Sequence, residues 1–212
     1  MDDNKKLGEV SEEDIKLVKA AEPDDIKEKE PVNLGNEVID WIESFVFAMF
    51  VVILIFTFFF RIVLVDGDSM NDTLTDGDRL IISHINYTPE KDDIVVINST
   101  VLNKTIIKRV IGTAGDHIIV NYNDNTVSVN GEVISNEHIK EAMYNTGRFD
   151  EEHKTSDNIY EYDVDEGCIF VMGDNRNHST DGRYIGLVKT EDVLGKAIFR
   201  LYPFETIGGL SK

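Results

Sequence analysis

An uninterrupted apolar run near the start of the chain constrains its fold most strongly. Residues 45–60, FVFAMFVVILIFTFFF, carry no charge and only one polar side chain, Thr57. A helix of this length spans about 24 Å, and apolar residues on both sides extend it toward the hydrocarbon thickness of about 30 Å. Because the run is apolar on every face of a helix, the sequence predicts a transmembrane helix over residues 38–61 and not a helix buried in a soluble core.

The segment before this run has the composition of a disordered tail. Residues 1–37 are rich in Asp, Glu and Lys and contain few large apolar side chains. Such a segment cannot bury enough surface to offset the entropy of ordering. A cleavable secretory signal is a poorer interpretation, because the run lacks a short basic region before it and a small-x-small site after it. We therefore expect an acidic tail followed by a single retained span.

The charge of the chain argues against one class of partner. The 212 residues carry a formal net charge of −19, and both sides of the apolar run are acidic. A surface that binds nucleic acid needs clustered Lys and Arg, so no nucleic acid partner is expected. The histidines lack metal-ligand spacing and Cys168 is the only cysteine, so no metal, cofactor or intrachain disulfide is expected.

The rest of the sequence is typical of a mainly β fold. Short segments rich in β-branched residues alternate with turn residues, and Asn123-Asp124-Asn125 separates two of them like a hairpin turn. The expected class is a set of packed antiparallel sheets. Strands are predicted at residues 62–65, 79–82, 93–97, 105–111, 117–120, 126–129, 169–172 and 196–202.

One long polar stretch interrupts this pattern. Residues 144–165 are acidic and show little periodicity, which predicts a flexible surface excursion or a functional flap. Residues 136–143 are the one segment beyond the span that could form a helix. We therefore divide the chain after the span into a β core, at residues 62–116 and 166–212, and a small inserted lobe at residues 117–165.

A serine and a lysine in this β core could act as a pair. Ser69 lies in a Gly- and Asp-rich segment, and Lys108 follows Ile106 and Ile107 in an apolar strand. A serine hydroxyl becomes an effective nucleophile when a neighbouring base removes its proton, and a neutral lysine can be that base. Desolvation in an apolar strand lowers the pKa of a lysine from about 10.4 toward roughly 7–8. The sequence therefore predicts a Ser–Lys dyad.

A late Gly- and Asp-rich segment adds carboxylates and a hydroxyl. An ionised carboxylate directly beside the lysine would favour the charged amine and oppose the lowered pKa. We therefore expect Asp174 and Asp181 to pair with Arg176 and Arg183. The hydroxyl of Ser179 could fix the direction of the amine without adding charge.

These segments resemble the motifs of type I signal peptidases. That family carries S-M-x-P-T-L at its nucleophile, K-R-V-x-G at its general base and G-D-N-R-x-x-S-x-D-S-R late in the chain. Here Ser69–Leu74 is SMNDTL, Lys108–Gly112 is KRVIG and Gly173–Arg183 is GDNRNHSTDGR. The order and spacing of the motifs and the preceding span agree, and the resemblance extends from the span to Tyr202.

The resemblance implies a role for individual residues. It implies that Ser69 is the nucleophile, that Lys108 is its general base and that Ser179 is the hydroxyl that orients the lysine. The main-chain N–H of Ser69 and donors near Gly67, where some family members place a serine, would hold the oxyanion. Two further sets are implied: Val65, Gly67, Met70, Leu74, Ile106 and Ile107 in the substrate pocket, and Asp174, Arg176, Asp181 and Arg183 in the scaffold around it.

The resemblance also implies a function and a location. The implied function is a membrane-bound endopeptidase that removes N-terminal signal peptides from exported preproteins, with a preference for Ala-x-Ala sites, through an acyl-enzyme. The N-terminus would be cytoplasmic, and the catalytic domain would lie outside the cell membrane, close to the lipid bilayer and the protein export machinery. The chain departs from the family pattern at Asp72 and Ala114, where proline is usual, and at Gly182, where serine is usual.

Three other interpretations are open on the sequence alone. His178 with Asp174 or Asp181 could serve a Ser–His–Asp hydrolase, although the nucleophile segment is not G-x-S-x-G. Cys168 could serve a sortase-like transpeptidase, although no T-L-x-T-C segment is present. A catalytically weakened or inactive homologue would act as a membrane-tethered β domain that binds partners.

Overall fold

The computed structural model describes residues 34–84, 87–135, 137, 139, 141–146 and 151–210. Most of the expected acidic tail, residues 1–33, lies outside the described residues. The chain falls into two compact units, the first of which ends at Met49 and the second of which begins at Phe50. The second unit contains all the strands that the structure describes.

A long apolar helix, α2 (Leu34–Phe59), contains the boundary between the two units. It is long and apolar enough to cross a membrane from Glu37 to Phe59, and every side chain in that range is exposed. An apolar surface of this extent is unfavourable in water and favourable in lipid. The helix therefore fits the span expected at residues 38–61.

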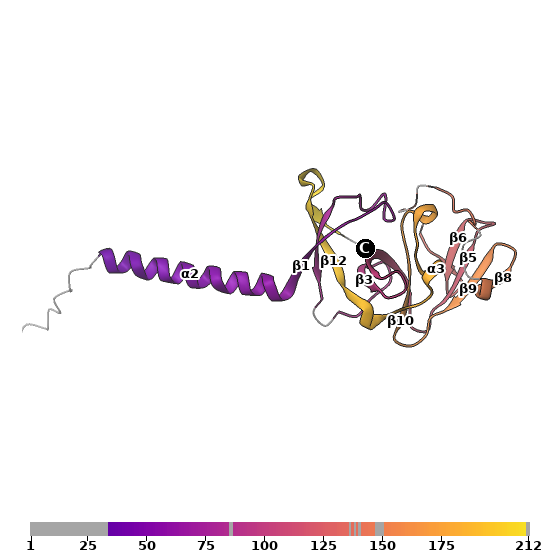
Figure 1. Cartoon of the computed structure of the whole chain (residues 1–212), viewed down its shortest axis with the longest axis horizontal. Helices are drawn as coiled ribbons and strands as arrows, with labels where there is room; N and C mark the ends of the chain where they lie inside the picture. Colours follow the sequence, from indigo (N-terminus) through magenta and orange to yellow (C-terminus); the bar gives the residue numbers. More distant parts are fainter. Residues whose placement is uncertain are drawn as a thin grey trace, which may run out of the picture. The chain divides into compact units, whose positions relative to one another are not determined.

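The described pairs of the larger sheet are all antiparallel. The strands of this sheet agree with most of the sequence predictions. Of the described residues, those in eight strands form this sheet. In sheet order they are β1 (Phe60–Leu64), β2 (Arg79–Ser83), β12 (Val193–Tyr202), β3 (Ile94–Ser99), β4 (Lys104–Thr113), β10 (Cys168–Met172) and β11 (Val188–Lys189), with β13 (Gly208–Gly209) paired to β12. Figure 1 shows strands β1, β3, β10 and β12 of this sheet.

The smaller sheet corrects one sequence prediction. Within the described residues it comprises β7 (Glu132–Val133), β6 (Thr126–Val129), β5 (His117–Asn121), β9 (Ile159–Asp163) and β8 (Lys154–Ser156), in that order. The stretch at residues 144–165 is therefore not a flap without regular structure, because it supplies two strands. Strand β9 alternates, with Tyr160 and Tyr162 buried and acidic neighbours pointing outward. Residues 147–150 of this stretch lie outside the described residues.

Beyond the end of α2, only short helices accompany these sheets in the described part of the second unit. They are η1 (Glu151–His153), η2 (Arg176–His178), α3 (Gly182–Ile185), η3 (Thr190–Asp192) and η4 (Phe204–Thr206). The helix considered for residues 136–143 is not formed at residues 137, 139 and 141–143, and its other positions lie outside the described residues.

The central strands of the larger sheet are buried on both faces. In β3, Ile94 and Val96 belong to one core cluster, whereas Val95 and Ile97 belong to another. Strand β4 is divided in the same way, with Ile107 in the first cluster and Ile106 and Val110 in the second. A polar side chain within this part of β4 is therefore withdrawn from water. A third cluster joins the two sheets through Ile111, Ile118, Val120, Tyr160, Tyr162, Phe170 and Met172.

Candidate active site

The turn between β1 and β2 presents Ser69. Two backbone hydrogen bonds close this turn at its base, from Val65 N to Asp78 O at 2.8 Å and from Gly77 N to Val65 O at 3.0 Å. The buried Met70 side chain anchors the turn in the core beneath it. Apolar anchoring on one side leaves the neighbouring serine hydroxyl free to face the groove described below.

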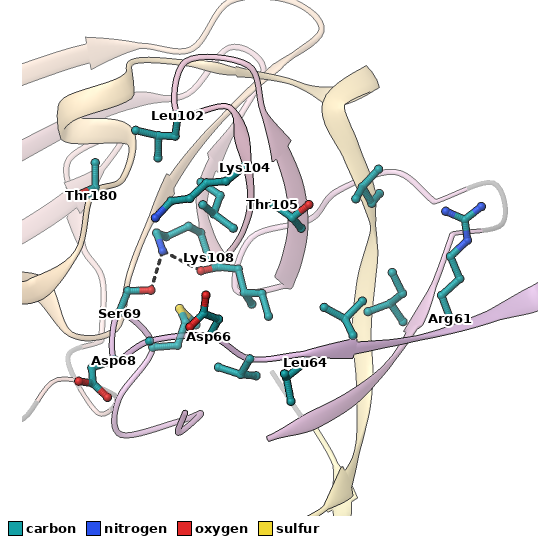
Figure 2. A pocket seen from close by; sticks show the side chains of 18 of the residues that line it. Arg61, Leu64, Asp66, Asp68, Ser69, Leu102, Lys104, Thr105, Lys108 and Thr180 are labelled. Atoms are coloured by element: carbon teal, nitrogen blue, oxygen red, sulfur yellow. Dashed lines mark hydrogen bonds between the residues drawn. The ribbon is translucent and has the colours of Figure 1, made fainter. Parts of the chain in front are cut away.

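Lys108 of β4 meets this serine. Its Nζ lies 2.7 Å from Ser69 Oγ and donates a second hydrogen bond of 2.9 Å to the carbonyl oxygen of Ile107 (Figure 2). The lysine is 3% exposed. Burial is the main reason that its pKa falls from 10.5 to about 8, because a charged amine is poorly solvated there. The charge of Lys104 acts in the same direction, whereas those of Asp181 and Asp174 oppose it.

The two carboxylates are neutralised by arginines, but one pairing differs from the prediction. Asp181 pairs with Arg183 as expected, with Nε–Oδ1 and Nη2–Oδ2 distances of 2.9 Å. Asp174 instead pairs with Arg109, at 2.9 Å and 2.8 Å. Arg176 donates to the Gly173 carbonyl oxygen at 3.2 Å. The register between β10 and β4 explains the pairing of Asp174 with Arg109. Met172 lies opposite Arg109, so Asp174, two residues further along the chain, lies near the Arg109 side chain.

The Ser179 hydroxyl does not contact the lysine amine by a well-formed hydrogen bond. Among the described residues, its buried Oγ has no partner at ordinary hydrogen-bond geometry. Burial alone would raise the pKa of Asp181, but the charge of Arg183 and hydrogen bonds from Arg183 and Gly173 lower it, and the nearby Ser179 hydroxyl acts in the same direction. Ser179 therefore lies beside Asp181, and its role toward Lys108 stays a prediction.

The Ser69–Lys108 pair opens into a groove of about 680 Å³. One wall is the continuous segment from Arg61 to Met70, and the other is the segment from Lys104 to Lys108 (Figure 2). Strand β3 pairs with one edge of β4 over residues 104–108, whereas β10 pairs with the other edge only from Arg109 onward. Over residues 104–108, no described strand therefore pairs with the edge of β4 that β10 leaves free.

Most of the expected pocket residues line this groove, but one does not. The lining includes Val65, Gly67, Met70, Ile106 and Ile107. Leu74 is 0% exposed and packs in the core beneath the turn. It therefore supports the pocket from behind.

The departures from the family pattern have separate structural settings. The side chain of Asp72 is exposed on the surface of the turn. Gly182 is tightly enclosed, because a Cβ there would lie 2.7 Å from the Val171 carbonyl oxygen and 2.9 Å from the Phe170 ring. A serine at position 182 would therefore require a shift of its neighbours.

Two residues that contact the site were not singled out from the sequence. Arg109 follows Lys108 directly and holds Asp174, which also accepts a hydrogen bond of 2.5 Å from the Thr73 hydroxyl. Asn175 donates to the backbone of the nucleophile turn at two points. Both residues lie inside the recognised motifs, but their partners are distant in sequence.

Known proteins match most of this chain. Residues 38–202 match the model of the family described as signal peptidase, peptidase S26. Signal peptidase I of Bacillus licheniformis is 34% identical over 184 residues, which cover 85% of this chain and 97% of the relative. Signal peptidase IB of Staphylococcus aureus (strain COL) is 32% identical over 180 residues, with coverages of 81% and 93%.

A solved structure also matches part of the chain. The crystal structure of a signal peptidase I from Enterococcus faecalis V583 has a TM-score of 0.41 and 29% sequence identity, and the match covers 52% of this chain and 97% of that one. The sequence matches, by contrast, extend over most of both partners and include the span and all three motifs. By these matches, the chain belongs to the signal peptidase family, peptidase S26.

Proposed function

We propose that this protein is a membrane-anchored serine endopeptidase that removes N-terminal signal peptides from exported preproteins. The observation that carries the proposal is the 2.7 Å contact between Ser69 Oγ and the buried Lys108 Nζ at an open groove. A lysine with a pKa near 8 is partly neutral at physiological pH and can accept a proton. The relatives that match this chain carry the name signal peptidase I.

The dyad would work through a covalent intermediate. In the neutral state the Ser69 hydroxyl donates to the lone pair of Lys108 Nζ, and the amine donates to the Ile107 carbonyl oxygen. As Oγ attacks the scissile carbonyl carbon, its proton passes to Nζ and then to the nitrogen of the leaving amine. The C–N bond breaks and an ester forms on Ser69. Lys108 then takes a proton from water as the water oxygen attacks the ester carbon. The C–O bond to Ser69 breaks, and Lys108 returns the proton to Oγ, which restores the hydroxyl.

The main-chain N–H of Ser69 is the proposed donor to the oxyanion. It has no hydrogen-bond acceptor among the described residues. The N–H of Gly67 is occupied, because it donates to Asp76 Oδ1 at 2.8 Å. Position 67 also offers no side-chain hydroxyl. We therefore assign the stabilisation of the negative charge mainly to the peptide between Asp68 and Ser69.

The groove would hold the substrate as an extended strand. The free edge of β4 over residues 104–108 presents backbone groups that can pair with an incoming peptide. Beside Ser69 the walls are formed by Val65, Met70, Ile106 and Ile107, each of which is largely buried. Walls that are closely packed leave room for small side chains, which supports a preference for Ala-x-Ala sites.

The anchor suggests where the reaction takes place. Strand β1 begins at the residue after α2, and Ser69 follows nine residues after Phe60. If α2 spans the bilayer, the chain itself keeps the nucleophile near the lipid surface. We propose that residues 1–37 are cytoplasmic, that residues 38–61 span the membrane and that the catalytic core lies outside it with its inserted lobe at residues 117–165. The partners would be preprotein signal peptides, the bilayer and the export machinery.

The direct test is cleavage of a preprotein by the full-length chain in lipid vesicles. Wild type is expected to release a mature protein whose new N-terminus follows an Ala-x-Ala sequence. Ser69→Ala removes the attacking oxygen and should lower the rate by at least about a thousandfold. Ser128→Ala, in β6, is the matched control and should cleave normally. Cleavage that survives Ser69→Ala in a purified preparation would refute the proposal.

The rate is expected to rise with pH, with a midpoint near 8. Below this pKa the Lys108 amine is protonated and cannot accept the serine proton, so kcat/KM should fall about tenfold for each pH unit. Above it the amine is neutral and the rate should level off. Lys104→Met removes a positive charge that disfavours protonation of Lys108, so it should move the midpoint to higher pH. A rate that stays constant between about pH 6.5 and 9 would contradict Lys108 as the base.

A further inference from the structure

The peptide group between Asp68 and Ser69 is held by a residue more than one hundred positions away. The side-chain amide of Asn175 donates from Nδ2 to the carbonyl oxygen of Asp68 at 3.0 Å. The backbone N–H of Asn175 donates to the carbonyl oxygen of Ser69 at 3.1 Å. The same Asp68 oxygen also accepts the Asn71 N–H of the turn, at 3.1 Å. Asn175 thus contacts the carbonyl groups on both sides of the Ser69 Cα.

The first of these contacts acts on the group that is proposed to bind the oxyanion. The Asp68 carbonyl and the Ser69 N–H belong to one peptide unit, which is planar and trans. In a trans peptide the C=O and N–H bonds point in opposite directions. A hydrogen bond that fixes the carbonyl oxygen therefore fixes the direction of the N–H on the other side. It also polarises the peptide and strengthens that N–H as a donor.

We propose that Asn175 is a positioning residue that aims the Ser69 N–H at the oxyanion of the tetrahedral intermediate. This inference rests on the proposed function and deepens its catalytic step. Asn175 does not touch the substrate in this account, because its amide acts through the Asp68–Ser69 peptide. The role is greater here than it would be with a serine at position 67, since Gly67 supplies no hydroxyl as a second donor.

The segment that carries Asn175 is itself firmly held against the nucleophile turn. Gly173 approaches so closely that a Cβ would lie 2.4 Å from the Ser69 carbonyl oxygen and 2.3 Å from Ser179 Oγ. Asp174 is fixed by two hydrogen bonds from Arg109 and one from Thr73. A donor on such a segment can hold its acceptor in one orientation, which is what an oxyanion site requires.

Asn175→Leu is the most direct variant, because it keeps a similar shape and the backbone N–H but removes the amide donor. We expect kcat to fall by about tenfold to a hundredfold, less than the loss for a true oxyanion donor. The midpoint of the pH–rate profile should stay within about 0.3 units, since neither Lys108 nor a charge is changed. Asn175→Ala, which introduces no bulk, should give the same kcat loss.

Two matched inhibitors separate this role from general support of the fold. A peptide aldehyde ending in Ala-x-Ala forms an adduct in which Ser69 Oγ bonds to the aldehyde carbon and the hydroxyl proton passes to Lys108, leaving an oxyanion. The corresponding peptide alcohol binds the same groove without forming this adduct. Asn175→Leu should lower the affinity for the aldehyde by the same factor by which it lowers kcat. Its affinity for the alcohol should stay within about twofold of the wild-type value.

The control is Asn177→Ala, two residues along the same segment. Asn177 donates to the Ala142 carbonyl oxygen at 3.0 Å and accepts from the Tyr144 N–H at 3.1 Å, so these hydrogen bonds go to residues outside the nucleophile turn. It should retain both kcat and aldehyde affinity. All assays are run below the melting transition of each variant, measured in the same detergent.

Three outcomes are distinguishable. Selective loss of kcat and aldehyde affinity in both Asn175 variants supports the inference. A kcat within twofold of wild type, or an equal loss of affinity for the aldehyde and the alcohol, overturns it. Failure of the wild-type protein to cleave any preprotein would refute the proposed function first and would be seen before any Asn175 variant is made.

Discussion

Lys108→Met is expected to lower kcat by at least about a thousandfold at every pH from 6 to 10. Methionine nearly matches the length of lysine but offers no lone pair that can accept the Ser69 proton. The 2.7 Å contact between Nζ and Oγ is then lost, and no other base in the described groove lies within hydrogen-bonding distance of that oxygen. The loss should be visible in single-turnover cleavage of a preprotein by the full chain in lipid vesicles.

Burial makes this substitution unusually informative. Lys108 is 3% exposed, so its replacement by an apolar side chain removes a polar group that is costly to bury. The variant should therefore be at least as stable as wild type, and its inactivity cannot be attributed to unfolding. Thermal unfolding and binding of the peptide alcohol would check both points.

Lys104→Met is the matched control for Lys108→Met. Lys104 lies four residues earlier on the same strand and lines the same groove, but the hydrogen bond to Ser69 comes from Lys108 (Figure 2). At pH 10, where Lys108 is already neutral, this variant should lose less than about tenfold in rate. If Lys108→Met cleaved at more than a few per cent of the wild-type rate, another group would have to be the base.

The contact between Ser69 and Lys108 could be predicted from sequence because each residue lies in a recognisable local motif. The apolar residues before Lys108 in β4 indicated a strand that would be buried, and the structure has Ile106 and Ile107 packed in two different cores. The turn that carries Ser69 was marked by its Gly and Asp residues. The order and spacing of the motifs resemble those of type I signal peptidases, and this resemblance predicted that Ser69 and Lys108 lie together.

The partner of Asp174 could not be predicted in the same way. The sequence placed Asp174 two residues from Arg176, and proximity along the chain favoured that pair. The structure pairs Asp174 with Arg109, because β10 and β4 are antiparallel neighbours with Met172 opposite Arg109. A pairing of this kind depends on sheet register, which no local pattern in either segment specifies.

Strand β9 was missed because its pattern is mixed with surface charge. Its sequence, Ile159-Tyr160-Glu161-Tyr162-Asp163, has the alternation of buried and less buried positions that a strand requires. The buried positions are tyrosines, however, and acidic residues surround them, so the hydrophobic pattern is weak. Burial against the other sheet decides the structure here, since Tyr162 packs on Phe170 with ring centroids 4.5 Å apart. The double contact of Asn175 was missed for a related reason, as its acceptors are backbone atoms of a distant turn.

Arg183→Met is expected to destabilise the second unit by about 3–5 kcal/mol, because it leaves a buried carboxylate without its countercharge. Asp181 is 0% exposed and receives two hydrogen bonds of 2.9 Å from the guanidinium of Arg183. The same guanidinium donates to the Arg176 carbonyl oxygen at 2.6 Å. Among the described residues, the backbone N–H groups of Gly173 and Arg183 would still donate to the carboxylate, and the neutral hydroxyl of Ser179 would lie nearby, but no countercharge would remain in contact with it.

The loss should extend to catalysis through the lysine. In the wild-type site the positive charge of Arg183 lowers the pKa of Lys108 and the negative charge of Asp181 raises it, so removing the arginine leaves the effect of Asp181 without that of its ion-pair partner. The pKa of Lys108 should therefore rise, and the midpoint of the pH–rate profile should move upward. At pH 7 a smaller fraction of the lysine would be neutral, and the rate should fall even in molecules that remain folded.

A compensating variant separates the buried charge from the lost packing. Asp181→Asn combined with Arg183→Met removes both charges, so it should recover a large part of the stability that Arg183→Met loses. Lys189→Met breaks an exposed ion pair with Glu191, at 3.3 Å, and should change the free energy of unfolding by less than about 1 kcal/mol. Thermal unfolding of the four proteins in one detergent measures these differences. If the double variant were no more stable than Arg183→Met, shape and hydrogen bonding of the arginine, and not its charge, would hold this segment beneath the dyad.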